Sequence, residues 1–149
     1  MKKTNSLRVA FVGLLFLLLS ACQSASTPAV STITTNIGEE VKVDGGSYTN
    51  VTVTELQDLL NKKDFTLINV HIPFEGNLPK TDLSIPYDTI GQNLSKLPGD
   101  KNEKLFLYCR SGRMSDIAAR ELVKLGYTNI WNLDGGMVAW EQAGFQIQK

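Results

Sequence analysis

Three short apolar runs have the pattern of buried β-strands: "FTLINV" at 65–70, "KLFLYC" at 104–109 and "NIWNL" at 129–133. Each is of strand length and is bounded by polar or turn-forming positions. Strands that are covered on both faces read as continuous apolar runs rather than as alternating ones. Two weaker segments, "VKVDGG" at 41–46 and "SIPYD" at 84–88, allow only brief strands, and a proline stops the second.

Amphipathic segments separate these runs. Thr52 and, three residues later, Glu55 resemble a capping box that opens a helix through "ELQDLLNK". Apolar residues share one face over 115–125, and Gly126 stands at the C′ position where helices commonly end. "TIGQNLSKL" at 89–97 predicts a further helix, and "GGMVAWEQAG" predicts a last short helix that starts at a glycine pair.

The alternation of these strands and helices predicts an α/β fold. It implies right-handed crossovers and a mostly parallel central sheet with helices on both faces. About 100 residues, 47–149, are enough for one domain with its own core. In such sheets, binding sites form outside the carboxyl ends of the strands. Cys109 ends the strongest predicted strand, so we expect it at that edge.

The N-terminus has the pattern of an export signal. Lys2, Lys3 and Arg8 precede an apolar run over 9–19. This run is too short to span a bilayer as a helix, which takes about 20 residues, but it suits the core of a signal peptide. A buried core helix is the alternative, and the flanking residues argue against it.

The apolar run ends in "LSAC", whose last residue is Cys22. This motif resembles the lipobox of bacterial lipoproteins. The resemblance implies that residues 1–21 are removed and that Cys22 carries lipid, so that the protein is exported and membrane-anchored at the bacterial cell envelope. An ordinary secretory signal with a chance cysteine is the alternative. Residues 22–46, rich in Ser, Thr and Ala, then form a flexible tether that carries the domain.

Charge and cysteine content narrow the possible functions. Three of the 15 Lys and Arg lie in the signal, which leaves 12 against 15 Asp and Glu and no basic tract, so nucleic acid is not an expected partner. With Cys22 lipidated, Cys109 has no disulfide partner. An unpaired thiol in an oxidising compartment is a liability unless the site needs it. The alternative for Cys109 is a small buried hydrophobe.

The loop that follows Cys109 predicts a thiolate site. Backbone N–H groups at a helix start are unpaired and carry partial positive charge, so a loop that curls round the sulfur favours the thiolate over the thiol. Gly112 permits a backbone angle that other residues resist, and Ser115 can cap the helix. Arg110 and Arg113 could grip an anionic substrate. A phosphate loop of the tyrosine-phosphatase kind is excluded, because it needs an arginine at the position of Ser115.

Taken together, "YCRSGRMS", "EL..LL" before "LINV", and "NLDGGMVAWEQAG" resemble a single-domain rhodanese, a sulfurtransferase, over about 100 residues. The resemblance implies a rhodanese-like fold over 47–149 and a monomer without metal or organic cofactor. It also implies that Cys109 takes a sulfane sulfur from thiosulfate, a polysulfide or a persulfide, and passes it to a thiol or cyanide. The residues expected to bind the substrate are Arg110, Ser111, Gly112, Arg113, Met114 and Ser115.

The sequence departs from the family's pattern at two places near this loop. Met114 stands where the family usually has an arginine, and Asn69-Val70-His71 stands for the usual Asp-Val-Arg. We therefore expect a weaker preference for thiosulfate. A non-catalytic rhodanese-like binding module at the cell envelope is the alternative function. A thiol-redox role is a third possibility, although with Cys22 lipidated no second thiol remains that would resolve a disulfide.

The sequence does not decide the role of one further residue near the cysteine loop, and it predicts no catalytic role for the others. His71, the only histidine, could approach the site, and we expect Glu75 to be solvated rather than to act as a general base. Tyr108 precedes Cys109 on its strand and therefore faces the opposite side. The remaining candidates are expected to have structural roles: Trp131 and Trp140 in packing, and Asp134 in the turn before the glycine pair.

Overall fold

A computed structural model of the protein describes residues 37–149. The predicted signal peptide, the predicted lipidation site Cys22 and most of the predicted tether lie outside the described residues. Among the residues that are described, no helix has the length and apolarity needed to cross a membrane.

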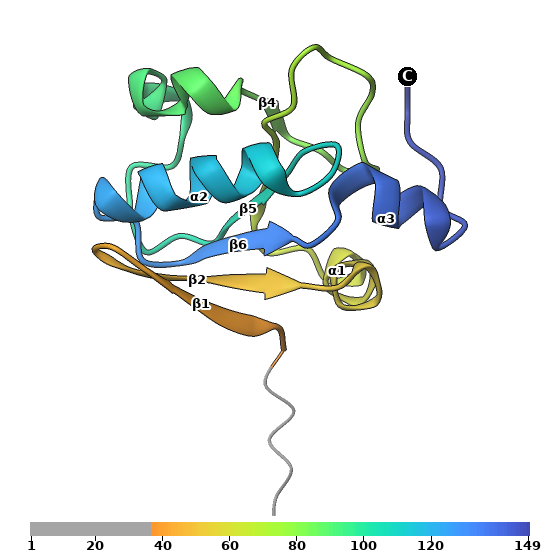
Figure 1. The fold of residues 1–149 in the computed structure, drawn as a ribbon, viewed down its shortest axis with the longest axis horizontal. Helices are drawn as coiled ribbons and strands as arrows, with labels where there is room; N and C mark the ends of the chain where they lie inside the picture. The colour runs from red at the N-terminus through yellow and green to blue at the C-terminus, as the bar shows by residue number, and fades with distance from the viewer. Residues whose placement is uncertain (1–36) are drawn as a thin grey trace, which may run out of the picture. The chain divides into compact units, whose positions relative to one another are not determined.

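The centre of the domain is a six-stranded sheet with the strand order β1-β2-β6-β5-β3-β4 (Figure 1). The β1–β2 pair is antiparallel and every other pair is parallel. The mostly parallel sheet predicted from the sequence is therefore confirmed. The strands are β1 (Glu39–Val43), β2 (Gly46–Val51), β3 (Thr66–Asn69), β4 (Leu83–Ser84), β5 (Leu105–Tyr108) and β6 (Ile130–Leu133).

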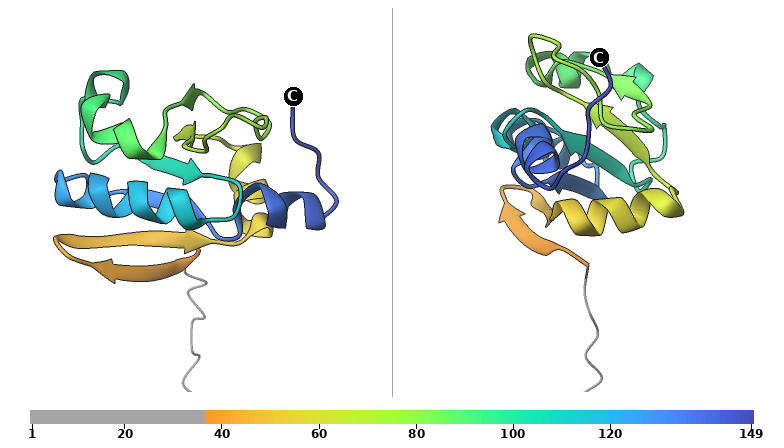
Figure 2. Two further views of the ribbon diagram at one scale, coloured as in Figure 1. Left: turned by 45° about the horizontal axis from the view of Figure 1, so that its top comes forward. Right: turned by 90° about the vertical axis from the view of Figure 1, so that its right-hand side faces the viewer.

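Helices cover both faces of this sheet, as predicted (Figure 2). One hydrophobic cluster joins one face of the sheet to α2 (Arg113–Lys124) and to the 3-10 helix η1 (Tyr87–Gln92). A second cluster joins the other face to α1 (Val53–Asn61) and to α3 (Gly136–Gln142).

The strand β5 and the residue after it show how the chain divides between these two clusters. Leu105, Leu107 and Cys109 belong to the cluster on the α2 side, whereas Phe106 and Tyr108 belong to the cluster on the α1 side. All five are fully buried, as expected for a central strand whose side chains alternate between two covered faces. The prediction that Tyr108 faces away from Cys109 is therefore confirmed.

The folded domain begins earlier than residue 47. β1 lies within 22–46, the range predicted to be a tether, and it overlaps the brief strand predicted at 41–46. It pairs with β2 from Glu39↔Asn50 to Val43↔Gly46. The side chain of Glu55 fixes the entry to this hairpin, because its Oε1 accepts a hydrogen bond from the Gly38 N–H at 2.8 Å. The same side chain completes the predicted capping box of α1 by accepting the Thr52 N–H at 2.8 Å.

The helix predicted over 89–97 is wrong in type. The segment forms two 3-10 helices, η1 and η2 (Leu94–Lys96), separated at Asn93, and the strand predicted over 84–88 ends at Ser84. Two residues that disfavour α-helix explain the difference. Asn93 donates from its side chain to the Thr89 carbonyl at 2.8 Å, and Gly91 lies so close to α2 that a Cβ there would be 3.2 Å from a Glu121 carboxylate oxygen.

Candidate active site

Cys109 follows β5 at the carboxyl edge of the sheet, as predicted, and its side chain is fully buried. It lies against an open pocket of about 280 Å³. Two donors face the sulfur: the Gly112 N–H at 3.2 Å and the Ser115 hydroxyl at 3.5 Å from Sγ. The residues that line the pocket are His71, Cys109, Arg110, Ser111, Arg113, Met114 and Val138.

The loop after Cys109 curls round the sulfur because Gly112 adopts a left-handed conformation, with φ of 90°. Gly112 is also the N-cap of α2, which begins at Arg113 rather than at Ser115. The backbone N–H of Asp116 bonds to the Gly112 carbonyl, so the N–H groups of residues 113–115 precede the first intrahelical bond. The helix start therefore leaves these three amides without an intrahelical acceptor, while the Gly112 N–H just before them faces the sulfur.

Ser115 does not cap α2, in contrast to the sequence-based expectation. The helix starts two residues earlier, so Ser115 lies in its first turn and is fully buried. Its hydroxyl donates to the Gly112 carbonyl at 3.0 Å or to the sulfur of Cys109 at 3.5 Å. The serine is therefore not a cap, and its hydroxyl lies where it can donate either to the sulfur or to the Gly112 carbonyl.

The start of α3, with the glycine pair Gly135 and Gly136, supports the cysteine loop. The N–H groups of Met137 and Val138 donate to the carbonyls of Cys109 and Arg110, each at 2.9 Å. Gly136 has a φ of 57°, and a Cβ there would lie 2.3 Å from the Cys109 carbonyl oxygen. Only glycine allows this close approach, which explains why the glycine pair accompanies the cysteine loop.

Tyr48 ties α2 to β2. Its hydroxyl donates to Asp116 in the first turn of α2, and the same carboxylate accepts Arg120 Nε at 3.0 Å. Burial, together with the hydrogen bond to Asp116, raises the pKa of Tyr48 to about 12, so the phenol is neutral at physiological pH. This cluster holds the start of α2 in place.

The two arginines of the loop have different environments. Arg110 Nη1 lies 2.7 Å from Glu75 Oε2, so an ion pair already engages this guanidinium. Arg113 is exposed, and among the described residues it takes part in no ion pair. Glu75 was expected to be solvated, and its side chain is 38% exposed, but it reaches the site through Arg110.

His71 forms a wall of the pocket. Its side chain is only 7% exposed, and its Nδ1 lies 3.4 Å from Met114 Sδ. The other ring nitrogen, Nε2, lies 3.4 Å from Glu75 Oε1 but without hydrogen-bond geometry, and it is buried with no hydrogen-bond partner among the described residues. The structure therefore brings together His71, Met114 and Cys109, whose relation the sequence left open.

Asn69, the last residue of β3, organises the loop that carries His71 and Glu75. Its Oδ1 accepts the His71 N–H at 2.9 Å, and its Nδ2 donates to the Gly76 carbonyl at 2.9 Å. Asn77 extends this support, because it exchanges two backbone hydrogen bonds with Gln148 near the C-terminus, each of 2.7 Å. From the sequence, Asn69 stood out only as a departure from the family's pattern and Asn77 did not stand out, although a buried polar residue at the end of an apolar strand is a usable signal.

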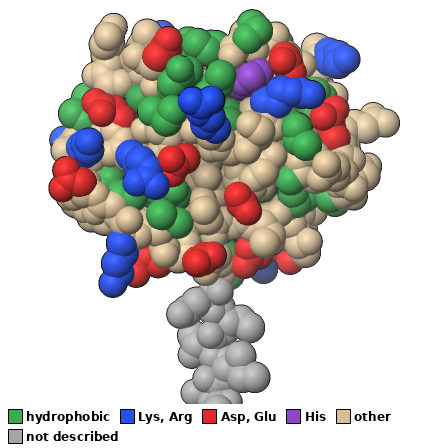
Figure 3. All heavy atoms as spheres, in the orientation of Figure 1, with side chains coloured by type: hydrophobic (Ala, Val, Ile, Leu, Met, Phe, Trp, Pro, Cys, Tyr) green, Lys and Arg blue, Asp and Glu red, His purple; other side chains and the backbone are tan. Residues whose placement is uncertain are grey.

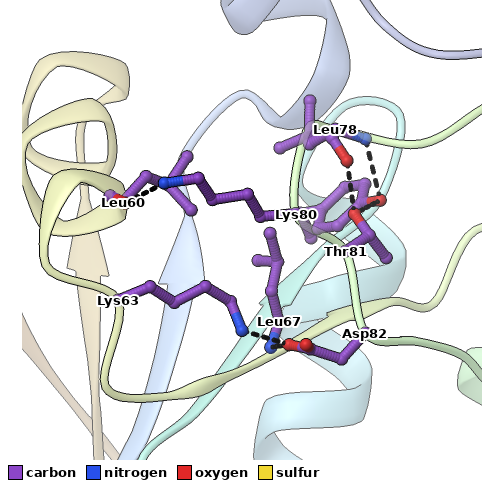
Figure 4. Close-up of polar contacts among 8 residues, drawn as sticks. Leu60, Lys63, Leu67, Leu78, Lys80, Thr81 and Asp82 are labelled. Carbon is purple, nitrogen blue, oxygen red and sulfur yellow. Dashed lines mark hydrogen bonds and ion pairs between the residues drawn. The ribbon is translucent and has the colours of Figure 1, made fainter.

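The continuation of the same loop is anchored to α1 and β3 (Figure 4). Asp82 Oδ2 accepts the Leu67 N–H at 2.7 Å and lies 2.5 Å from Lys63 Nζ. Lys80 donates to the Leu60 carbonyl at 2.6 Å, and this contact satisfies one carbonyl at the end of α1. The loop between β3 and β4 is therefore fixed at both of its ends.

Basic and acidic side chains are interspersed on the face of the domain that Figure 3 shows. A nucleic-acid-binding surface would gather its basic residues in one patch or stripe. The absence of a nucleic-acid partner stays a prediction.

A comparison with protein families matches residues 52–143 to the family described as Rhodanese-like domain. The chain belongs to this family. A sulfurtransferase from Allochromatium vinosum is 34% identical over 94 residues, which cover 61% of this chain and 85% of that protein. A probable adenylyltransferase/sulfurtransferase, MoeZ, from Mycobacterium tuberculosis is 36% identical over 95 residues, but the match covers only 24% of that longer protein.

Solved structures give the same assignment. The crystal structure of a rhodanese-like domain protein from Staphylococcus aureus is 31% identical, with a TM-score of 0.55, and the match covers 67% of this chain and 98% of that one. The rhodanese-like fold expected from the sequence is therefore confirmed. The family and the names of its sulfurtransferase members support sulfur transfer in general for this rhodanese-like domain.

Proposed function

We propose that this rhodanese-like domain is a sulfurtransferase that carries sulfane sulfur as a persulfide on Cys109. The observation that carries the proposal is the placement of the Cys109 sulfur. It lies against an open pocket, with the Gly112 N–H at 3.2 Å and the Ser115 hydroxyl at 3.5 Å. A buried small hydrophobe would need neither donor.

In the first step the Cys109 thiolate attacks the outer sulfur of the donor. With thiosulfate, a new S–S bond forms while the bond between the two donor sulfurs breaks, and sulfite leaves with that electron pair. The product is Cys109–S–S⁻, and the total charge is unchanged. This is covalent catalysis by an activated nucleophile.

In the second step a thiolate or cyanide attacks the terminal sulfur of the persulfide. The S–S bond breaks, the electron pair returns to Cys109 as thiolate, and the acceptor leaves as an organic persulfide or as thiocyanate. Neither step changes the overall oxidation level, so the chemistry balances without a metal or redox cofactor.

The loop donors suit both anions that this cycle forms. The thiolate and the persulfide each place negative charge near the Gly112 N–H and the amides at the start of α2. A hydrogen bond to a charged group stabilises it by about 1.5–3 kcal/mol, more than a bond between neutral groups. The exposed guanidinium of Arg113 adds a positive charge at the pocket.

Steady-state kinetics test this proposal. With thiosulfate as donor and cyanide as acceptor, we expect parallel double-reciprocal lines, because sulfite leaves before the acceptor reacts. Cys109→Ser should abolish thiocyanate formation while the far-ultraviolet circular dichroism stays unchanged. If the wild type transfers no sulfur from thiosulfate, a polysulfide or a small persulfide, the binding-module alternative would replace the enzyme.

We further propose that the protein works at the cell envelope, anchored through lipid on Cys22. The "LSAC" motif after an apolar run of signal length supports this proposal. Two or more acyl chains give stable attachment where a single chain does not. A tethered monomer would then meet small sulfur donors and thiol acceptors outside the cytoplasm.

A further inference from the structure

The pocket beside Cys109 offers less positive charge than its two arginines suggest. The Glu75 carboxylate lies 2.7 Å from Arg110 and 3.4 Å from His71, and both of these partners line the pocket. An ion pair of this kind compensates the guanidinium charge. Among the residues described, Arg113 is therefore the only arginine of the pocket lining that forms no ion pair with a carboxylate.

The rest of the pocket lining presents mostly apolar surface. The thioether of Met114 packs on the ring of His71, with Sδ 3.4 Å from Nδ1, and Val138 contributes from the start of α3. A thioether is adaptable and polarisable, and it favours apolar or sulfur-containing groups over strongly hydrated anions. A donor that enters here must shed part of its hydration against these side chains, which is costlier for a dianion than for a monoanion.

We propose that Glu75 is a specificity-determining residue, which holds Arg110 in an ion pair and thereby selects sulfane donors that carry one negative charge and an apolar group. Organic thiosulfonates and organic persulfides have this chemistry, and thiosulfate, a small dianion, does not. The inference rests on the proposed function. It concerns residues outside the cysteine loop, because Glu75 and His71 both lie on the loop after β3.

Two donors that differ only in charge and apolar surface test the inference. Thiosulfate and methanethiosulfonate present the same outer sulfur, but a methyl group replaces one anionic oxygen in the second. Cys109 thiolate attacks that sulfur in either donor, and sulfite or methanesulfinate leaves with the electron pair. The ratio of kcat/KM for the two donors therefore reports how the pocket treats the additional charge.

We expect wild-type protein to prefer methanethiosulfonate. Glu75→Gln should raise kcat/KM for thiosulfate about fivefold, mainly through KM, because an exposed charge pair is worth up to about 1 kcal/mol and a factor of ten corresponds to about 1.4 kcal/mol. The gain with the monoanion should be smaller. Glu103→Gln removes one exposed carboxylate from the loop before β5, outside the pocket lining, and should leave the donor ratio unchanged.

A double-mutant cycle isolates the role of Arg110. If Glu75 acts by engaging this guanidinium, the gain from Glu75→Gln should disappear in the Arg110→Gln background. A full gain in that background would overturn the ion-pair step. An unchanged donor ratio in Glu75→Gln, while both donors still load sulfur, would overturn the inference and leave the proposed function standing. If the wild type accepts sulfur from neither donor, the proposed function fails and the inference fails with it.

Discussion

Gly136→Ala tests whether α3 holds the cysteine loop in its active shape. The substitution places a Cβ 2.3 Å from the Cys109 carbonyl oxygen and 2.8 Å from the Arg110 carbonyl carbon. Both contacts are with backbone, so no flexible side chain can move to relieve them. The loop must shift away from α3, and the hydrogen bonds from Met137 and Val138 weaken or break.

Three contributions set the expected loss of stability. Alanine at a φ of 57° costs about 1–2 kcal/mol relative to glycine. Each of the two backbone hydrogen bonds is worth about 1 kcal/mol. We therefore expect Gly136→Ala to lower the free energy of unfolding by about 3–4 kcal/mol, which most domains survive. Sulfur loading of Cys109 should fall about tenfold or more, because the loop amides move relative to the sulfur.

The chain offers a matched control for the backbone contribution. Gly144 also has a positive φ, 88°, but a Cβ there meets nothing within 4 Å. Gly144→Ala should therefore cost only about 1–2 kcal/mol and leave sulfur loading unchanged. Urea unfolding and the rate of sulfur loading compare the two variants. Equal losses of stability, or normal loading in Gly136→Ala, would refute the role assigned to the contact between α3 and the loop.

Three further outcomes are expected. Arg113→Ala should lower kcat/KM for thiosulfate several-fold and Met114→Arg should raise it, measured by initial rates; unchanged kinetics in both would contradict anion binding at this loop. Hydrogen bonds from the Thr52 and Gly38 N–H groups lower the pKa of Glu55. In urea titrations Glu55→Gln should cost about 1 kcal/mol at pH 7, and this difference should vanish as the pH falls through the lowered pKa, because only the carboxylate is stabilised. Cys22→Ala should abolish lipid attachment in membrane fractionation, and normal acylation of this variant would exclude the anchor.

The sequence was sufficient to predict Cys109 and the loop that follows it as the centre of the site. β5 is a continuous apolar run, and the cysteine, glycine and arginines that follow are contiguous in sequence. The position of Cys109 at the sheet edge follows from those features alone. The role of Gly136 was harder to predict from the sequence. Its close approach to the Cys109 carbonyl depends on how α3 packs against the end of β5, which no local pattern shows.

Features that depend on long-range contacts were predicted only in part or missed. A brief strand was expected at 41–46, but β1 starts earlier, at Glu39, and is stabilised by pairing with β2 and by the bond from Gly38 to Glu55. The ion pair between Glu75 and Arg110 joins two loops that are far apart in sequence, so no local pattern reveals it. The start of α2 was misplaced because the left-handed conformation of Gly112 ends the loop before Ser115.

The most direct test of the central claim is the intact mass of the protein after incubation with a sulfane donor and removal of excess donor. We expect one added sulfur atom, about 32 mass units, because the nucleophile carries the transferred group covalently. A thiol or cyanide should remove the added mass, and Cys109→Ser should never acquire it. An unmodified mass after thiosulfate, methanethiosulfonate and polysulfide, or an equal gain in Cys109→Ser, would contradict transfer through a Cys109 persulfide.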